Sequence, residues 1–278
     1  MSPENYSGIK LSRLLPGRSR AAIRAKIRKM KIRLDLFGQK YRDKKQEFTR
    51  KVAQNVKPKV VYEAYAGAGH QTVIWSEFAN EVYAAEWNTT KKEQFLRTVE
   101  SAGFKVYLEE GKWLHLRKRK KQIHYFAGDA IEGAANMRVQ GVEVDLVDLD
   151  TCGSTLLTLP LFLVLLKPQH VVITHGEFHS LRFKREDVLR RLLIHRDIST
   201  PSFPMTIEQL AKELDKAVKT AALRAHNETK DSFWVELQDE LWLGTKEQGM
   251  LRRHYQIKKP PATADCLNII SDSDNKPE

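Results

Sequence analysis

The stretch Lys59–Asn88, KVVYEAYAGAGHQTVIWSEFANEVYAAEWN, decides the fold of this chain of 278 residues. Its first part, Val60–Tyr65, is an apolar, β-prone run that ends at a Gly-rich turn. Gln71–Ala79 then predicts a helix, and Glu81–Glu86 predicts a second strand that ends in a carboxylate. This order of elements is typical of the front half of a nucleotide-binding α/β sheet.

The residues of the Gly-rich turn discriminate between possible ligands. A dinucleotide fingerprint needs a third small residue where the helix meets the pyrophosphate, and Thr72 stands there instead. The Gly-Lys-Ser/Thr sequence of phosphate-binding loops is absent. S-adenosylmethionine (SAM) has no phosphate, and it needs close backbone approach and a carboxylate for its ribose hydroxyls. Two glycines, Gly67 and Gly69, and two carboxylates, Glu63 and Glu86, meet this demand.

Residues from about Val60 to Thr174 resemble a class I SAM-dependent methyltransferase. The resemblance implies an α/β fold with a doubly wound, mostly parallel, Rossmann-like sheet, here with a small basic helical N-terminal extension. It also implies SAM as the cofactor and methyl transfer as the activity. By position, the expected cofactor-binding residues are Glu63, Gly67 and Gly69 at the methionine part, Glu86 at the ribose, Trp87 near the adenine, and Asp129, within Ala127–Ala130, at the adenine amino group.

The run VDLVDLDTCGST over residues 144–155 predicts a strand whose carboxyl end faces the methyl donor. Asp148–Ser154 resembles the Asp-Leu-Asp-Pro-Phe-Gly-Ser motif of tRNA guanine-N2 methyltransferases, with Thr-Cys in place of Pro-Phe. Methylation of an exocyclic amino group needs an oxygen that accepts the N–H and aims the nitrogen lone pair. Asp150, with Asp148 beside it, is the candidate for that acceptor.

A second chemistry stays open at the same strand end. Methylation of cytosine carbon-5 needs a thiolate that attacks carbon-6. Cys152 lies where cytosine-5 methyltransferases have their nucleophile, although Thr151 replaces the Pro before it, and Tyr65–Gly69 resembles that family's Phe-Ala-Gly-x-Gly opening. The partner acid would be Glu177, after a strand predicted at His170–Thr174. Otherwise Cys152 is a small turn residue, and the chain is an amino methyltransferase or a nucleic-acid-binding regulator with a degenerate methyltransferase fold.

The net charge of +12 is unevenly distributed along the chain. Residues 1–59 hold 18 Lys and Arg against 4 Asp and Glu, a net of +14. Residues 60–278 hold 29 against 31, a net of −2. A basic extension on a nearly neutral body predicts an arm that docks on phosphate backbones of DNA or tRNA. The alternative is a solvated, disordered tail.

Within this arm, residues 9–33 predict a short helix, a turn at Pro16-Gly17 and a basic helix over Arg20–Met30 capped by Ser19. The pattern resembles Myb-like and phage-type helix-turn-helix modules; an amphipathic surface helix is the alternative. A further charged helix is predicted over residues 40–55. The candidate nucleic-acid-binding residues are Arg18, Arg20, Arg24, Arg28 and Lys29 in the arm, and Arg117 and Arg119 in a basic run, Arg117–Lys121, within the predicted hairpin or loop Gly111–Tyr125.

The sequence predicts three regions and few special features beyond them. The regions are a basic helical arm (1–57), a methyltransferase domain (58–260) and a disordered tail (261–278), with a late helix at Met205–His226 and strands at Phe233–Leu243 and Met250–Lys259. The longest apolar run, Leu156–Leu166, is too short to span a bilayer, and no signal-peptide core precedes it. We therefore expect a cytoplasmic or nuclear protein with two free thiols, no metal and no membrane partner; the oligomeric state stays open.

Overall fold

The computed structural model describes residues 41–151, 153–194, 203–229, 234–243 and 250–258. The chain divides into two compact units, Met1–Glu47 and Phe48–Glu278. In the first unit only residues 41–47 are described, and they are helical. The helical run continues to residue 56, close to the range predicted from the sequence. The second unit holds the elements considered below.

The bounds of the elements follow the hydrophobic pattern closely. The strands are β1 (Val60–Ala64), β2 (Glu81–Ala85), β3 (Lys105–Glu110), β4 (Trp113–Lys118), β5 (Lys121–Phe126), β6 (Leu146–Leu149), β7 (His170–His175), β8 (Trp234–Leu243) and β9 (Met250–Lys258). The helices are α3 (His70–Phe78), the 3-10 turn η2 (Thr89–Lys91), α4 (Lys92–Ser101), α5 (Ala130–Val139), α6 (Leu159–Leu166), α7 (Phe178–Arg182), α8 (Glu186–Ile194) and α9 (Ile207–Thr229).

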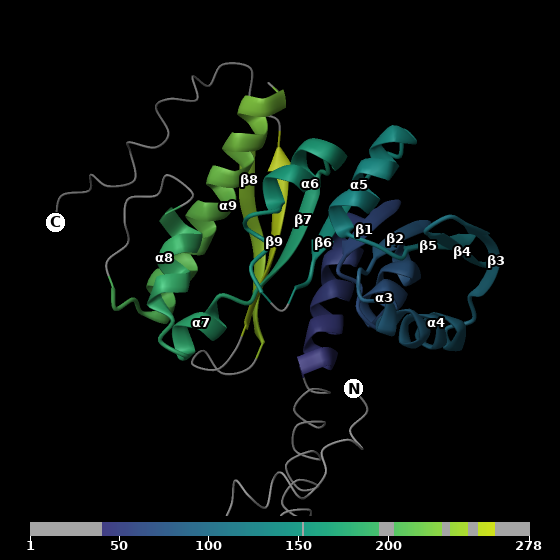
Figure 1. Cartoon of the computed structure of the whole chain (residues 1–278), viewed down its shortest axis with the longest axis horizontal. Coiled ribbons are helices and arrows are strands. Elements are labelled where there is room, and N and C mark those ends of the chain that lie inside the picture. The colour runs from purple at the N-terminus through teal and green to yellow at the C-terminus, as the bar shows by residue number, and fades with distance from the viewer. Residues whose placement is uncertain (1–40, 152, 195–202, 230–233, 244–249, 259–278) are drawn as a thin grey trace, which may run out of the picture. The chain divides into compact units, whose positions relative to one another are not determined.

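The described strands form one sheet in the order β3-β4-β5-β2-β1-β6-β7-β9-β8 (Figure 1). The five inner strands run parallel to one another, in the order β5, β2, β1, β6 and β7. Antiparallel strands extend the sheet on both sides, β4 and β3 beyond β5, and β9 and β8 beyond β7. This arrangement confirms the predicted α/β class with a mostly parallel sheet.

Strand β1 is buried on both faces, which explains its continuous apolar run. Alternate residues of a strand point to opposite faces of a sheet. Tyr62 and Ala64 belong to a core that also contains side chains of α5, α6 and α9. Val61 belongs to a second core, shared with α3, α4 and the helix over residues 41–56. The sheet is therefore covered by helices on both faces (Figure 1).

The edge of the sheet beyond β5 is only partly as predicted. The run Gly111–Tyr125 was predicted as a hairpin or loop, and β4 and β5 do form an antiparallel hairpin. The sequence did not show that this hairpin belongs to the main sheet, where β5 pairs in parallel with β2. Strand β3 was not predicted at all. All six of its residues are exposed and half of them are charged, so it lacks the alternation that marks a half-buried strand. Helices α7 and α8 were not predicted from the sequence either.

None of the described helices is long and apolar enough to cross a membrane.

Two pairs of neighbouring histidines lie between adjacent antiparallel strands. His115 and His124 pair across β4 and β5, with their Nδ1 atoms 2.6 Å apart. His170 on β7 and His254 on β9 lie with Nδ1 and Nε2 3.1 Å apart. Burial, together with the smaller effect of the neighbouring histidine, lowers the pKa of His124 and that of His254 to about 4. Both side chains are therefore neutral in the folded protein near pH 5, where an unfolded chain would protonate them.

These histidines make the folded protein sensitive to mild acid. A folded-state pKa near 4 and an unfolded value of 6.5 mean that stability is full above about pH 6.5 and falls between pH 6.5 and 4. Each such histidine contributes about 1.4 kcal/mol per pH unit in that window. Urea denaturation of His124→Gln at several pH values should show a shallower decline than the wild type. Val139→Ala, a change at an exposed residue that does not titrate, should keep the wild-type slope. Equal slopes in wild type and His124→Gln would contradict this account.

Candidate functional site

The four central parallel strands bring their carboxyl ends to one edge of the sheet. Strand β1 ends at the Gly-rich turn and β2 ends just before Glu86. Strand β6 is followed by Asp150, and β7 leads to Glu177. Because ligands of open α/β sheets bind outside the carboxyl ends of the strands, this edge is the candidate site.

The Gly-rich turn requires left-handed backbone at three of its residues. Tyr65, Gly67 and Gly69 have φ values of 68°, 57° and 78°. At Gly69, an added Cβ would come within 2.8 Å of the ring of Phe95, so this glycine permits close packing of α4. At Gly67, an added Cβ would meet only the Tyr65 carbonyl oxygen, at 4.0 Å. Gly67 therefore leaves open space where a ligand can approach the backbone.

The Glu86 carboxylate ties this turn to the second strand. Its Oε2 accepts a hydrogen bond from the Gly67 N–H at 2.9 Å, and its Oε1 accepts one from the Asn88 N–H at 2.8 Å. The side chain is 8% exposed, so these bonds hold it in a defined place at the strand end. The structure thus brings together Gly67 and Glu86, two residues that the sequence predicted to share one site.

The start of α3 offers further polar groups beside the turn. Its N-cap, Gly69, has no side chain to accept from the first N–H groups of the helix. Gln71 is 5% exposed, and its Oε1 has no hydrogen-bond partner among the described residues. A helix N-terminus suits a carboxylate, and a buried amide oxygen suits an ammonium group. The methionine part of SAM carries both groups, so the chemistry of this site fits that cofactor.

Glu63 lies beneath the turn. Its carboxylate accepts a hydrogen bond from Thr72 Oγ1 at 2.5 Å, and the side chain is 1% exposed. Burial raises the pKa of Glu63 well above its ordinary value, and the nearby Asp148 raises it further. Through this bond Glu63 fastens α3 to β1, and the cofactor contact that the resemblance implies for Glu63 stays a prediction.

Asp148 is fully buried and engaged with the interior of the sheet. Its Oδ2 accepts from Arg252 Nη2 at 2.7 Å and from Trp75 Nε1 at 2.8 Å. The same guanidinium donates to Thr174 and Thr49 at 2.7 and 3.2 Å. Asp148 therefore positions the strand, and Asp150, two residues further and partly exposed, stands closer to the open edge.

The segment after β6 turns sharply. Thr151 Oγ1 donates to the Gly153 carbonyl oxygen at 2.9 Å and accepts from the Gly153 N–H at 3.2 Å. Cys152 itself lies outside the described residues. The turn holds the backbone on either side of it close to the carboxyl edge of the sheet.

His175 and Glu177 form a buried pair at the end of β7. His175 Nδ1 lies 3.6 Å from Glu177 Oε2, and the two side chains are 0% and 1% exposed. Neither imidazole nitrogen and neither carboxylate oxygen has a hydrogen-bond partner within the described part of the chain. The sequence predicted Glu177 as a site residue but not His175, because the sequence does not show that His175 is buried beside it.

The two remaining predicted cofactor contacts differ in their settings. Trp87 follows Glu86 directly and is 70% exposed, an unusual state for an indole, which leaves it available to a ligand. Asp129 caps α5, because its Oδ1 accepts from the N–H groups of Ile131 and Glu132 at 2.8 and 3.3 Å. An adenine contact at Asp129 would have to use its other oxygen.

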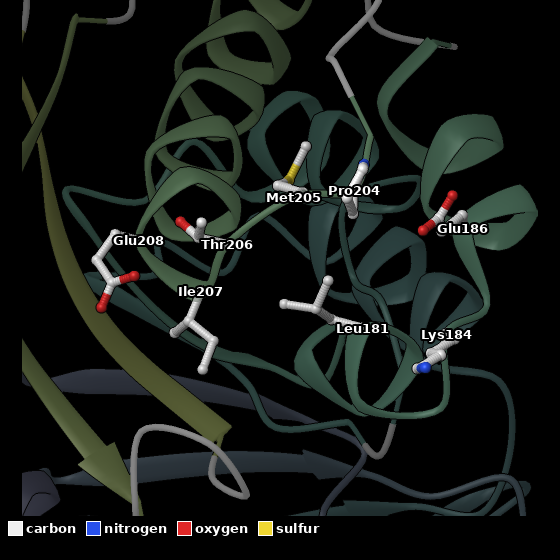
Figure 2. A pocket seen from close by; sticks show the side chains of 8 residues that line it. All are labelled: Leu181, Lys184, Glu186, Pro204, Met205, Thr206, Ile207 and Glu208. Carbon is white, nitrogen blue, oxygen red and sulfur yellow. The ribbon is translucent and has the colours of Figure 1, made fainter.

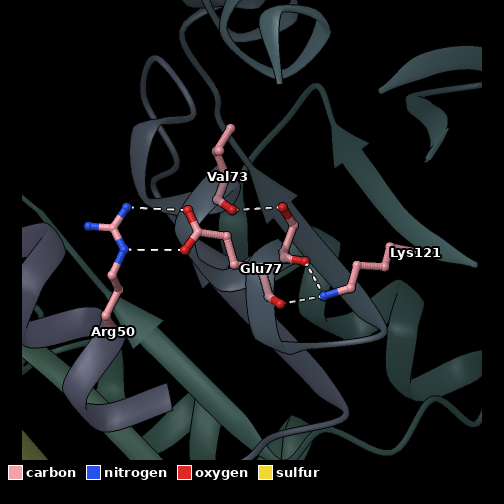
Figure 3. Close-up of polar contacts among 5 residues, drawn as sticks. Arg50, Val73, Glu77 and Lys121 are labelled. Carbon is pink, nitrogen blue, oxygen red and sulfur yellow. Dashed lines mark hydrogen bonds and ion pairs between the residues drawn. The ribbon is translucent and has the colours of Figure 1, made fainter. Parts of the chain in front are cut away.

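The basic run between β4 and β5 proves partly structural (Figure 3). Lys121 Nζ donates to the carbonyl oxygens of Ser76 and Glu77 at the end of α3, at 2.7 and 2.5 Å. Lys118 Nζ likewise donates to the Ala102 carbonyl oxygen after α4, at 2.6 Å. Cations at helix C-termini are stabilising because the last carbonyls carry partial negative charge. These two lysines therefore stabilise the fold by binding the ends of α3 and α4.

Of the two arginines predicted to bind nucleic acid in that run, Arg117 covers the Tyr107 ring with its guanidinium carbon 4.4 Å from the ring centroid. Arg119 occupies the turn with a φ of 56°. Both predictions remain open. The arm residues Arg18, Arg20, Arg24, Arg28 and Lys29 lie outside the described residues.

A cavity of about 550 Å³ lies between α7, α8 and the start of α9 (Figure 2). Its walls are mainly carbon, with Lys184, Glu186 and Glu208 as the charged side chains. Because α7 follows the carboxyl end of β7, this cavity belongs to the same side of the sheet. Among the described residues, no three His, Cys, Asp or Glu side chains are grouped so as to hold a metal ion.

No protein-family model matches the chain, and no curated protein matches it significantly. Several solved structures, however, are similar to it. Trm1 from Pyrococcus horikoshii, in complex with SAM, is 16% identical with a TM-score of 0.62; the match covers 80% of this chain and 55% of Trm1. Trm5b from Pyrococcus abyssi (10% identity, 77% and 48% coverage, TM-score 0.46) and the M. jannaschii tRNA m1G37 methyltransferase (14%, 77% and 49%, 0.44) are also similar.

Of these three structures, Trm1 has a TM-score above 0.5, and the similarity to Trm1 shows the fold. The chain has the class I methyltransferase fold. It spans about half the length of Trm1.

The cofactor site can be tested by binding alone. Glu86→Gln replaces one acceptor oxygen by an NH2 group that faces a backbone N–H, and it removes the charge expected at the ribose. Calorimetry should show SAM affinity reduced about tenfold or more, the cost of one charged hydrogen bond. Gly67→Ala should weaken binding too, because its methyl group enters the open space and its φ is unfavourable. Glu143→Gln, on the exposed surface, should bind SAM as the wild type does. Wild-type affinity in both site variants would remove the cofactor from this edge.

Proposed function

We propose that the protein is a SAM-dependent methyltransferase that acts on a base in a nucleic acid, with RNA as the substrate. The observation that carries the proposal is the hydrogen bond between Gly67 and Glu86 at the carboxyl edge of the sheet. Beside it, within the described part of the chain, the start of α3 has no side-chain cap and the Gln71 Oε1 has no hydrogen-bond partner. Support comes from the fold shared with Trm1, whose solved complex contains SAM.

The proposal assigns the cofactor contacts as follows. The α3 N-terminus and Gln71 would hold the methionine part, Glu86 the ribose hydroxyls, and Trp87 the face of the adenine. SAM supplies the methyl group that is transferred. Gly67 leaves room for the cofactor to approach the backbone, because glycine has no Cβ atom to occupy that space.

The acceptor side of the reaction is assigned to Asp150. A carboxylate oxygen there accepts the N–H of an exocyclic amino group, holds the base, and directs the nitrogen lone pair towards the methyl group. The buried contacts of Asp148 keep this strand end in place. The Asp-Leu-Asp sequence, similar to that of tRNA guanine-N2 methyltransferases, favours RNA over DNA.

A second candidate reaction, methylation of cytosine carbon-5, draws support from Glu177. Its carboxylate is buried at the correct edge and lacks a hydrogen-bond partner in the described chain, as expected for an acid that binds the base ring. This reaction needs Cys152 as the nucleophile. The two proposals therefore differ in which residue is indispensable.

Paired substitutions separate the two reactions. For amino methylation, Asp150→Ala should reduce the rate about 100-fold or more, because a well-placed acceptor is lost from the site. Cys152→Ser should retain measurable activity, and a substrate containing 5-fluorocytosine should form no covalent complex. Transfer of labelled methyl groups to RNA, with nucleoside mass spectrometry of the product, measures the rates and identifies the base. A trapped adduct through Cys152 would establish the cytosine reaction instead.

The basic arm predicts a strong salt dependence of binding. Lys and Arg that neutralise phosphates release counterions, so affinity falls as salt rises. Each lost phosphate contact reduces the magnitude of the slope of log affinity against log salt by about 0.7–0.9. Deleting residues 1–35 should therefore flatten the slope for RNA. Deleting residues 261–278, the polar tail, should leave it unchanged. If the arm deletion also leaves the slope unchanged, the arm makes no phosphate contacts.

A further inference from the structure

The turn between α7 and α8 carries an aromatic ring that the core does not use. Phe183 is 52% exposed and lies directly after α7. Around it, His179, Arg182, Lys184 and Arg185 are also exposed. An exposed phenylalanine among cations differs from an apolar patch, because its neighbours are hydrated charges and not other hydrocarbon groups.

The Phe183 ring is held by three polar side chains. The guanidinium carbon of Arg182 lies 4.6 Å from the ring centroid, and that of Arg185 lies 5.8 Å from it. The His179 ring lies 4.5 Å away with an interplanar angle of 57°. Arg182 Nη2 also contacts His179 Nδ1 at 3.3 Å. The ring is therefore fixed in position while about half of its surface stays open to solvent.

The backbone of the turn is equally well determined. Lys184 adopts a φ of 52°, and its N–H donates to the Leu181 carbonyl oxygen at 3.0 Å. The Arg185 N–H donates to the Ser180 carbonyl oxygen at 2.8 Å. This pair of bonds across a left-handed residue is the Schellman pattern that ends many helices. It presents Phe183 and its cations from a rigid support, which lowers the entropic cost of binding.

The turn lies on the same side of the sheet as the candidate site. Strand β7 runs parallel to β6, with Ile173 opposite Leu149, so the two strands end at one edge. Helix α7 starts at Phe178, three residues after β7 ends. The turn after α7 is thus connected through one short helix to the edge that carries Asp150.

The charge of this segment favours a polyanion. Residues 178–191 contain five Lys and Arg against two Asp and Glu, whereas residues 60–278 as a whole contain 29 against 31. One more arginine of the segment, Arg190, covers the ring of Phe203 at 4.5 Å. The adjoining cavity contains Glu186 and Glu208 against one cation, Lys184, and this net negative charge disfavours a phosphate there. Anionic groups are therefore favoured at the arginines of the turn rather than in the cavity, where Figure 2 shows the carboxylates of Glu186 and Glu208.

We propose that Phe183 is a stacking platform for an unpaired base of the RNA substrate, with Arg182 and Arg185 binding the phosphates next to that base. This inference rests on the proposed function for the identity of the polyanion. An aromatic face stacks on any base, and neighbouring arginines neutralise the backbone, which is how single-stranded nucleic acids are held without reading sequence. The platform binds the RNA strand next to the target base, and the target base itself binds at the carboxyl edge of the sheet.

The platform can be tested with RNA binding that needs no catalysis. The probe is a single-stranded oligouridine carrying one 2-aminopurine, whose fluorescence falls when the base stacks. Phe183→Ala should raise its Kd about 5- to 100-fold and reduce the quenching, as expected for the loss of one stacked base. Phe183→Tyr should restore both. Val139→Ala, a change at an exposed apolar residue of α5, should bind like the wild type.

The arginines give a second, independent readout. Arg182→Ala combined with Arg185→Ala should lower the magnitude of the salt slope by about 1.4 for a single strand, whereas Phe183→Ala should leave the slope unchanged. Circular dichroism and SAM calorimetry on each variant confirm the fold and the cofactor site. Wild-type Kd and quenching in folded Phe183→Ala would overturn the platform even if methyl transfer to RNA is observed. Quenching that depends on Phe183 in a protein that binds no SAM would support the platform and reject the proposed function.

Discussion

The buried guanidinium of Arg252 connects more elements of this fold than any other group described above. It comes from β9 and contacts Asp148 on β6, Thr174 on β7 and Thr49 on the helix over residues 41–56. Trp75 of α3 donates to the same oxygen of Asp148. A buried charge is very costly without its partners, so these elements are stable only when they are assembled together.

This constraint reaches the functional edge through the register of the strands. Asp148 pairs with Glu63 on β1 and with Val172 on β7, so the anchor lies one residue before the end of β1 and of β6 and three residues before the end of β7. Asp150 and the Gly-rich turn are carried by strands that cannot slip without breaking the buried pair. Glu63, a predicted cofactor contact, and Asp148, a predicted catalytic residue, are both buried beneath the strand ends and bond to neighbouring elements.

Local patterns predicted the elements that are buried on both faces and the turns between them. The apolar run Val60–Tyr65, the glycines after it and the carboxylate Glu86 were sufficient to predict their juxtaposition, because parallel neighbours end at the same edge. Exposed strand β3 escaped prediction since no face of it is buried. The basic run Arg117–Lys121 was interpreted by charge alone, whereas two of its lysines bind helix ends that are distant in sequence.

The sequence by itself determined the α/β class, the order of the central elements and the position of the Gly-rich turn, because each depends on the periodicity and conformational range of adjacent residues. Only the tertiary structure decided which carboxylates lie at the open edge of the sheet and which are buried beneath it, and that Phe183 stands among cations on the surface. Those outcomes depend on contacts between residues far apart in the chain. Burial and electrostatic pairing are properties of that assembled packing, and no single segment contains them.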